Sequence, residues 1–158
     1  MKFKMTDKGP KLDEKKVTAF ESRHGFTLPD QYRQFLLRTN GGIPSPDVSF
    51  TFVEDGKATD SVIDQFYMLK KNDDDMNLDE AIEMFVEAGR MPAHFLPFAS
   101  DQFGNQLCLS LAPSDLGVVY FWNHEKEPED GSLATGDHIL RVANGFEVFF
   151  DSLLTMEG

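Results

Sequence analysis

Apolar side chains recur at helical spacing near the start of the chain. Val17 and Phe20 share one face of a helix that we predict over residues 12–24, and Gly25 can adopt the left-handed conformation that ends a helix. A second helix is predicted over residues 29–39, where the spacing i, i+3, i+4 and i+7 repeats. The residues at these four positions are Tyr32, Phe35, Leu36 and Thr39.

Alternating apolar and polar residues follow in the middle of the chain. Residues 48–53 have the sequence VSFTFV, a β-branched and aromatic alternation that predicts a strand before the turn at residues 54–56. Two antiparallel strands are predicted on either side of a turn at residues 113–115. These two strands span 107–111 and 117–122, and further strands are predicted over 65–69 and 139–142.

Helix-capping patterns mark two more helices. Asn77 followed by Glu80 predicts the start of a helix that ends near Gly89. Its buried face consists of Leu78, Ile82, Phe85 and Val86. Asn144 followed by Glu147 predicts the start of a closing helix. The apolar stripe of that helix consists of Phe146, Phe149, Phe150 and Leu153.

The chain has the length of one domain. Its 158 residues fall within the range of about 100 to 200 residues for a single domain, and no repeat or Pro/Ser/Gly-rich linker divides them. We therefore predict a single domain over residues 1–158, in which residues 1–11 form a loosely ordered lead-in.

Charge narrows the classes of partner. The chain has 15 Lys and Arg against 27 Asp and Glu, a formal net charge of −12. Nucleic acids and anionic membranes are excluded as general partners, because both require clustered basic side chains. A basic protein is the partner that this charge favours.

The sequence has neither a long apolar run nor an apolar leader with a cleavage site, so we expect a cytoplasmic protein. The sequence leaves the oligomeric state open.

Residues 54–87 concentrate the acid, with eleven Asp and Glu against three Lys. The acidic spacing from Asp73 onward resembles a calcium loop, but Leu78 stands where such a loop needs Gly and Met84 where it needs Glu. Two interpretations remain, a solvated acidic face and a surface that binds a protein partner. The candidate partner-binding residues are Asp73, Asp74, Asp75, Asp79, Glu83 and Glu87.

Patterns of catalytic or metal-binding residues are missing from the sequence. The four histidines form no HxH or HExxH pair, and the single cysteine, Cys108, lies within an apolar alternation. The glycine-rich stretches lack the spacing and the lysine of a phosphate-binding loop. We therefore expect no enzymatic activity, no metal and no cofactor.

Three segments occur in an order that is typical of one family. Residues 28–44 contain LPDQYRQFL and NGGIP, residues 96–125 contain LPFA, GN and GVVYFW, and residues 143–147 are ANGFE. These segments resemble the SUKH superfamily, which joins fungal cell-wall-synthesis regulators of the Smi/Knr type with bacterial toxin-immunity proteins. The motif residues to which we assign structural roles are Leu28, Pro29, Tyr32, Phe35, Leu36, Asn40, Gly41, Gly42, Asp101, Gly104, Asn105, Tyr120 and Trp122.

The resemblance implies an α+β fold, in which a central and mostly antiparallel sheet is packed by helices from both ends of the chain. It implies binding rather than catalysis, with the motif aromatics in the core and the motif glycines in turns. The favoured function is that of an immunity protein that neutralises a basic toxin domain, often a nuclease, by direct binding. The alternative is a regulatory or scaffold module without a toxin partner. Small-molecule binding, a third possibility, requires an apolar pocket.

Overall fold

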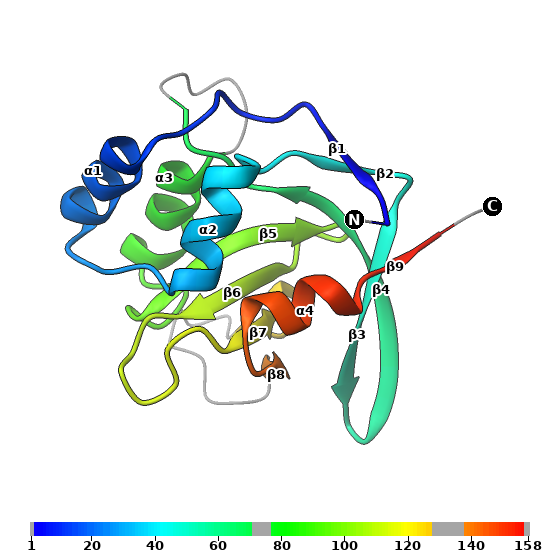
Figure 1. Ribbon diagram of the computed structural model, residues 1–158. Coiled ribbons are helices and arrows are strands. Elements are labelled where there is room, and N and C mark those ends of the chain that lie inside the picture. Colours follow the sequence, from blue (N-terminus) through cyan, green and yellow to red (C-terminus); the bar gives the residue numbers. More distant parts are fainter. Residues whose placement is uncertain (1, 71–76, 128–137, 157–158) are drawn as a thin grey trace.

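Antiparallel strands form the centre of the protein, whose computed structural model describes residues 2–70, 77–127 and 138–156. Within these residues, a seven-stranded sheet has the order β8-β7-β6-β5-β4-β3-β9, and β1 pairs separately with β2 (Figure 1). From β3 to β8, each strand pairs with its neighbour in sequence. The strands are β1 (Lys4–Thr6), β2 (Ile43–Ser45), β3 (Val48–Glu54), β4 (Lys57–Phe66), β5 (Phe95–Asp101), β6 (Gln106–Ser110), β7 (Val119–Trp122), β8 (Ile139–Ala143) and β9 (Leu154–Thr155).

Local capping interactions define where the first helix begins and ends. The side chain of Asp13 accepts the N–H of Lys16 at 2.9 Å, and Gly25, with φ of 71°, ends the helix as its sequence predicts. The helices of the described residues are α1 (Glu14–His24), α2 (Asp30–Arg38), α3 (Leu78–Ala81), the π-helix η1 (Ile82–Glu87), the 3-10 helix η2 (His124–Lys126) and α4 (Phe146–Ser152). None of them is long and apolar enough to cross a membrane.

Helices α2 and α4 cover one face of the sheet (Figure 1). The ring centroid of Tyr32 in α2 lies 5.9 Å from that of Phe98 in β5 and 5.3 Å from that of Phe146 in α4. Each fully buried aromatic side chain stabilises the fold by about 1.5–3 kcal/mol. This aromatic layer therefore fixes both helices against the sheet.

The π-helix η1 covers the opposite face. In β7, Phe121 lies 5.8 Å from Phe50, which in turn contacts Phe149 of α4. Successive side chains of a strand point to opposite faces, so Trp122 points away from α4. Its ring lies 5.4 Å from that of Phe85 in η1. The core thus has two layers, one on each side of the sheet.

The expected α+β fold, with a mostly antiparallel sheet and helices from both ends of the chain, is confirmed. The predicted helices at 12–24, 29–39, from Asn77 and after 144 correspond to α1, α2, α3 with η1, and α4. The predicted strands at 48–53, 107–111, 117–122 and 139–142 correspond to β3, β6, β7 and β8.

The first residues of the chain differ from the expected loose lead-in. β1 pairs with β2, which places Met5 opposite Pro44, and both Phe3 and Met5 are buried. The ring of Phe3 also lies 5.4 Å from that of Phe150 in α4. Two apolar residues that alternate with lysines are sufficient for a strand here, because β2 supplies the hydrogen-bonding partner.

Strand β4 was also predicted in the wrong place. We expected a strand over residues 65–69, whereas β4 begins at Lys57 and ends at Phe66. Its first four residues are all exposed and include no large apolar side chain, so they carry no apolar alternation; pairing with β3 makes them a strand. β5 was not predicted as a strand, because all seven of its residues are buried and no alternation marks them.

The start of the closing helix differs from the predicted cap at Asn144. The N-cap of α4 is Gly145, and the N–H of Glu147 donates to Oε1 of Gln31 in α2 at 3.0 Å. Asn144 instead accepts a hydrogen bond from Arg141 at 2.8 Å. A side chain far away in sequence therefore performs the capping that the local pattern assigned to Asn144.

Candidate functional site

Of the six candidate partner-binding carboxylates, Asp79, Glu83 and Glu87 lie in the described residues. Asp73, Asp74 and Asp75 lie outside these residues. Glu83 and Glu87 are exposed on η1. Because η1 is a π-helix, whose hydrogen bonds span five residues rather than four, the α-helical face expected for the acidic residues does not continue through it.

Asp79 belongs to an internal cluster that joins α3 to α1, which lie side by side (Figure 1). Its carboxylate oxygens lie 3.0 Å from Nη2 of Arg23 and 2.6 Å from Nε2 of His24. The ring of His24 stacks on Phe26 with 5.4 Å between centroids. Asp79 therefore holds two helices together, and we leave it out of the proposed binding surface.

Arg90 fixes the end of η1 against the sheet. Its guanidinium carbon lies 4.8 Å from the ring centroid of Phe85 and 5.4 Å from that of Trp122. Two of its nitrogens donate to the carboxylate of Glu127 at 3.0 and 3.2 Å. Arg90 thus makes cation–π contacts and a bidentate ion pair at the same time. These contacts fix η1, which carries the exposed acidic residues, against the sheet.

Asn40, a motif residue, connects three segments of the chain. Its amide nitrogen donates to the carbonyls of Pro10 and Leu69 at 2.8 and 2.7 Å, and its oxygen accepts the N–H of Leu69 at 2.8 Å. The next residue, Gly41, has φ of 65°, and a Cβ there would lie 2.5 Å from the carbonyl oxygen of Tyr67. Only glycine fits at this close approach.

A buried carboxylate holds the turn between β5 and β6. Asp101 is 3% exposed and accepts hydrogen bonds from Ser61 Oγ at 2.8 Å and from the N–H groups of Phe103 and Asn105 at 3.0 and 2.8 Å. The side-chain amide of Asn105 also donates to it, at 3.0 Å. Gly104 supplies the positive φ of 85° that the turn requires. Asp101 is thus occupied by internal donors and serves the turn.

His124 ties η2 to the same turn. Its Nε2 lies 2.6 Å from the carbonyl oxygen of Phe103, which can only accept, so Nε2 carries the donated proton. The backbone N–H of His124 donates to Oδ1 of Asn105 at 3.0 Å. The turn is therefore fixed from both sides, while the Phe103 side chain remains 61% exposed.

A second carboxylate holds the loop after β6. Asp115 accepts hydrogen bonds from Ser110 Oγ at 2.5 Å and from the Tyr120 hydroxyl at 2.6 Å. These bonds, that from Ser110 first, lower the pKa of Asp115. Burial, and secondly the bond to Asp115, raise the pKa of Tyr120. The Ser110 hydroxyl therefore donates to a carboxylate whose lowered pKa makes it a weak base.

The single thiol is shielded. Cys108 is fully buried, its Sγ lies 3.7 Å from Sδ of Met91, and burial raises its pKa well above the ordinary value. A thiol of this kind is a poor nucleophile, because the thiolate is the reactive form.

In the described ranges, no group of three or more His, Cys, Asp or Glu side chains could hold a metal ion.

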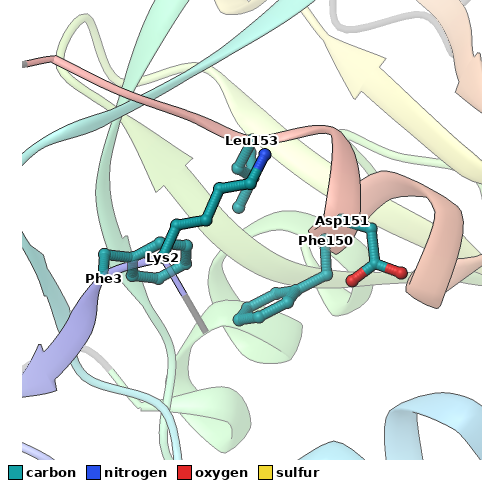
Figure 2. Close-up of a pocket in the computed structure, with 5 residues that line it drawn as sticks. All are labelled: Lys2, Phe3, Phe150, Asp151 and Leu153. Carbon is teal, nitrogen blue, oxygen red and sulfur yellow. The ribbon is translucent and has the colours of Figure 1, made fainter.

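One pocket lies between the start of the chain and α4. Figure 2 shows Lys2 and Phe3 on one side and Phe150 and Asp151 on the other, with Leu153 above them. Its volume is about 420 Å³, which is within the usual range for ligand pockets. Its two charged side chains are both exposed, however, and no buried polar group points into it to orient a ligand. We assign no ligand to it.

The structural roles expected for the motif residues agree with their positions. The aromatic and aliphatic positions Leu28, Tyr32, Phe35, Leu36 and Trp122 are buried, as is Pro29. The glycines Gly41, Gly42 and Gly104 all have positive φ. The polar positions Asn40, Asp101, Asn105 and Tyr120 make the hydrogen bonds described above.

Fold and motif residues together define an α+β domain of a single antiparallel sheet with a helix layer on each face. The chain belongs to the SMI1 / KNR4 family (SUKH-1), whose family model matches residues 11–152. The resemblance found in the sequence is thereby confirmed. Comparison with curated proteins gave no match.

Sequence reasoning missed Phe103. All 19 Phe, Tyr and Trp residues of the chain lie in the described ranges, and Phe103 is the one whose side chain is exposed. The sequence feature that could have marked Phe103 is its position in the turn between Asp101 and Gly104, outside any predicted helix or strand that would bury its ring.

Proposed function

We propose that the protein is a non-catalytic binding domain that acts as an immunity protein in the cytoplasm and neutralises a basic toxin domain by direct contact. Membership of the SMI1 / KNR4 family supports a fold of this kind. The formal net charge of −12 supports a basic protein as the partner.

The observation that carries the proposal is an acidic face on the η1 side of the sheet, consisting of Asp60, Asp64, Glu83 and Glu87. All four side chains are exposed. Asp60 lies opposite Thr51, on the side of β3 away from Phe50, and Asp64 accepts a hydrogen bond from Ser100 at 3.5 Å. Each of these carboxylates can therefore meet a partner's basic side chains without disturbing the core.

The chemically reactive groups support binding rather than catalysis. Asp101 and Asp115 hold loops through internal donors, and Cys108 is buried with a raised pKa. Asp101 and Cys108 are shielded from solvent, and the lowered pKa of the partly exposed Asp115 makes it a weak base toward the neighbouring Ser110, whereas hydrolytic and transfer reactions require an accessible and activated nucleophile or base.

The test is protection by co-expression. The product of a toxin-like reading frame beside this gene is induced in a host with and without the chain, and survival is measured. Restored growth together with direct binding of the purified proteins supports an immunity protein. Binding to a product that does not arrest growth supports the regulatory or scaffold alternative. Absence of both protection and binding contradicts the immunity function and favours the regulatory or scaffold alternative, which has no toxin partner.

A matched pair of charge reversals locates the contact. Glu83→Lys with Glu87→Lys should slow association, because electrostatic attraction raises association rates by about 10- to 1,000-fold, and the difference should shrink at high salt. Glu147→Lys with Asp151→Lys makes the same change in charge on two exposed residues of α4 and should have a smaller effect. Equal slowing of association by both pairs of substitutions would mean that the association rate depends on the net charge of the protein and not on the position of these carboxylates.

A further inference from the structure

We propose that Phe103 and the carboxylates around it form a receptor for an arginine side chain of the basic partner. This inference rests on the proposed function and adds the position and chemistry of one contact. We name this region the Phe103 surface, and it consists of Phe103, Glu54, Asp55, Asp60 and Glu125.

Phe103 has no role in the core that would explain an aromatic residue at its position. It is 61% exposed, whereas no other Phe, Tyr or Trp side chain in the chain is exposed. Turn tips usually carry Gly, Asn, Asp or Ser, whose backbone preferences suit a turn. Aromatic residues and arginine are enriched at the centres of protein interfaces. The exposed Phe103 ring is thus available for contact with another molecule.

The backbone beneath this ring is already ordered. Phe103 donates its N–H to the buried carboxylate of Asp101 and accepts from His124 through its carbonyl. The N–H of the preceding residue, Gln102, donates to the carbonyl of Val62 in β4 at 3.0 Å. A side chain presented on a fixed backbone loses little conformational entropy when it binds, which favours affinity.

Acidic residues lie on the segments that adjoin the turn, either directly or through η2. Lys126 of η2 lies 3.1 Å from Glu54 and 3.9 Å from Asp55, so η2 also reaches the tip of the β3–β4 hairpin. Four carboxylates on these segments stand against two lysines, Lys57 and Lys126. These segments therefore carry more negative than positive charge. Asp60 also belongs to the acidic face defined above. A cationic group is thus the complement of this surface.

The protein already contains the combination that we propose for the interface. Arg90 stacks on the ring of Phe85 while its guanidinium donates two hydrogen bonds to Glu127. Arginine suits such a place better than lysine, because its planar guanidinium stacks on an aromatic face and pairs with a carboxylate at the same time. The Phe103 surface offers an exposed ring together with the exposed residues Asp55, Asp60 and Glu125, while Glu54 already pairs with Lys126.

The test uses two short peptides in place of the unidentified partner. Hexa-arginine and hexa-lysine are titrated into ¹⁵N-labelled full-length protein, and binding is followed by NMR at the amides of residues 102–105 and 124–125. We expect hexa-arginine to shift these amides and to bind about two- to fivefold more tightly than hexa-lysine, which is the range for an exposed cation–π contact. Phe103→Ala should remove this preference and leave the unfolding midpoint unchanged.

Two variants keep the test decisive. Phe103→Leu retains an apolar side chain without the π-face and should also lose the preference, whereas Val148→Ala, at a site exposed to the same 61%, should keep it. Equal binding of both peptides to the wild type, or a preference that survives in Phe103→Leu, overturns the inference. Either result leaves the proposed function intact, because that function is tested by protection from the toxin-like product.

Discussion

Removal of the Asp101 carboxylate should cost a large share of the stability of the domain. In the folded protein this carboxylate accepts four hydrogen bonds, two of them from backbone N–H groups of the turn. Hydrogen bonds to charged groups contribute about 1.5–3 kcal/mol each, and such contributions do not add fully within one network. We therefore expect Asp101→Ala to lower the free energy of unfolding by about 3–5 kcal/mol, out of a typical 5–15 kcal/mol.

The measurement is urea unfolding at neutral pH, followed by far-UV circular dichroism. Asp115→Ala is the matched control, because Asp115 also holds a loop but accepts two side-chain hydrogen bonds and is partly exposed. It should cost about 1–2 kcal/mol. Hydrogen exchange at the amides of Phe103 and Asn105 should accelerate in Asp101→Ala more than at amides of β7.

Two outcomes would refute this reasoning. A loss below about 1 kcal/mol in Asp101→Ala would mean that the turn finds other acceptors for its donors at little cost. Equal losses in Asp101→Ala and Asp115→Ala would mean that burial and the number of donors do not determine the cost.

Three further predictions concern the core and the pH dependence. Trp122→Ala should lower the free energy of unfolding by about 3–5 kcal/mol, and an unchanged urea midpoint would contradict its place in the core. Tyr32→Phe should leave stability equal or raise it by up to about 1 kcal/mol, because the buried hydroxyl has no hydrogen-bond partner among the described residues; a clear loss in urea unfolding would contradict this. Asp115 has a lowered pKa in the folded protein, so its contribution is present above the ordinary Asp value of about 3.9 and is lost as the pH falls through the lowered pKa. Acid unfolding of Asp115→Asn should therefore depend less steeply on pH below about 4 than that of the wild type, and identical slopes would refute it.

The elements that the sequence predicted correctly are those whose own residues carry the pattern. α2 buries Tyr32, Phe35 and Leu36 at helical spacing, and β3 alternates buried and exposed residues. In both, the period of the apolar residues matches the geometry of the element. Among the motif residues, Tyr32, Phe35 and Leu36 belong to this local pattern, whereas Asn40 and Asp101 also bond to segments distant in the sequence.

The elements that were missed depend on contacts between distant segments. The first residues of β4 are a strand through their pairing with β3, and the α4 cap comes from Gln31. Asp79 contacts Arg23 and His24 of α1, which are distant from it in the sequence. No local pattern encodes these pairings, so the sequence shows the charge of the candidate residues but not the contacts that each one makes.

The order of strands in the sheet has a consequence for folding. β3 to β8 pair in the order of the chain, so each new strand can add to the previous one after closure of a comparatively short loop. β9 alone returns from the far end of the chain, where Thr155 pairs with Val48 of β3. Closing so long a loop carries the largest entropic cost in the sheet. We therefore expect β3 to β8 to form before β9 during folding, and native-state hydrogen exchange to show β9 opening at lower free energy than the rest of the sheet.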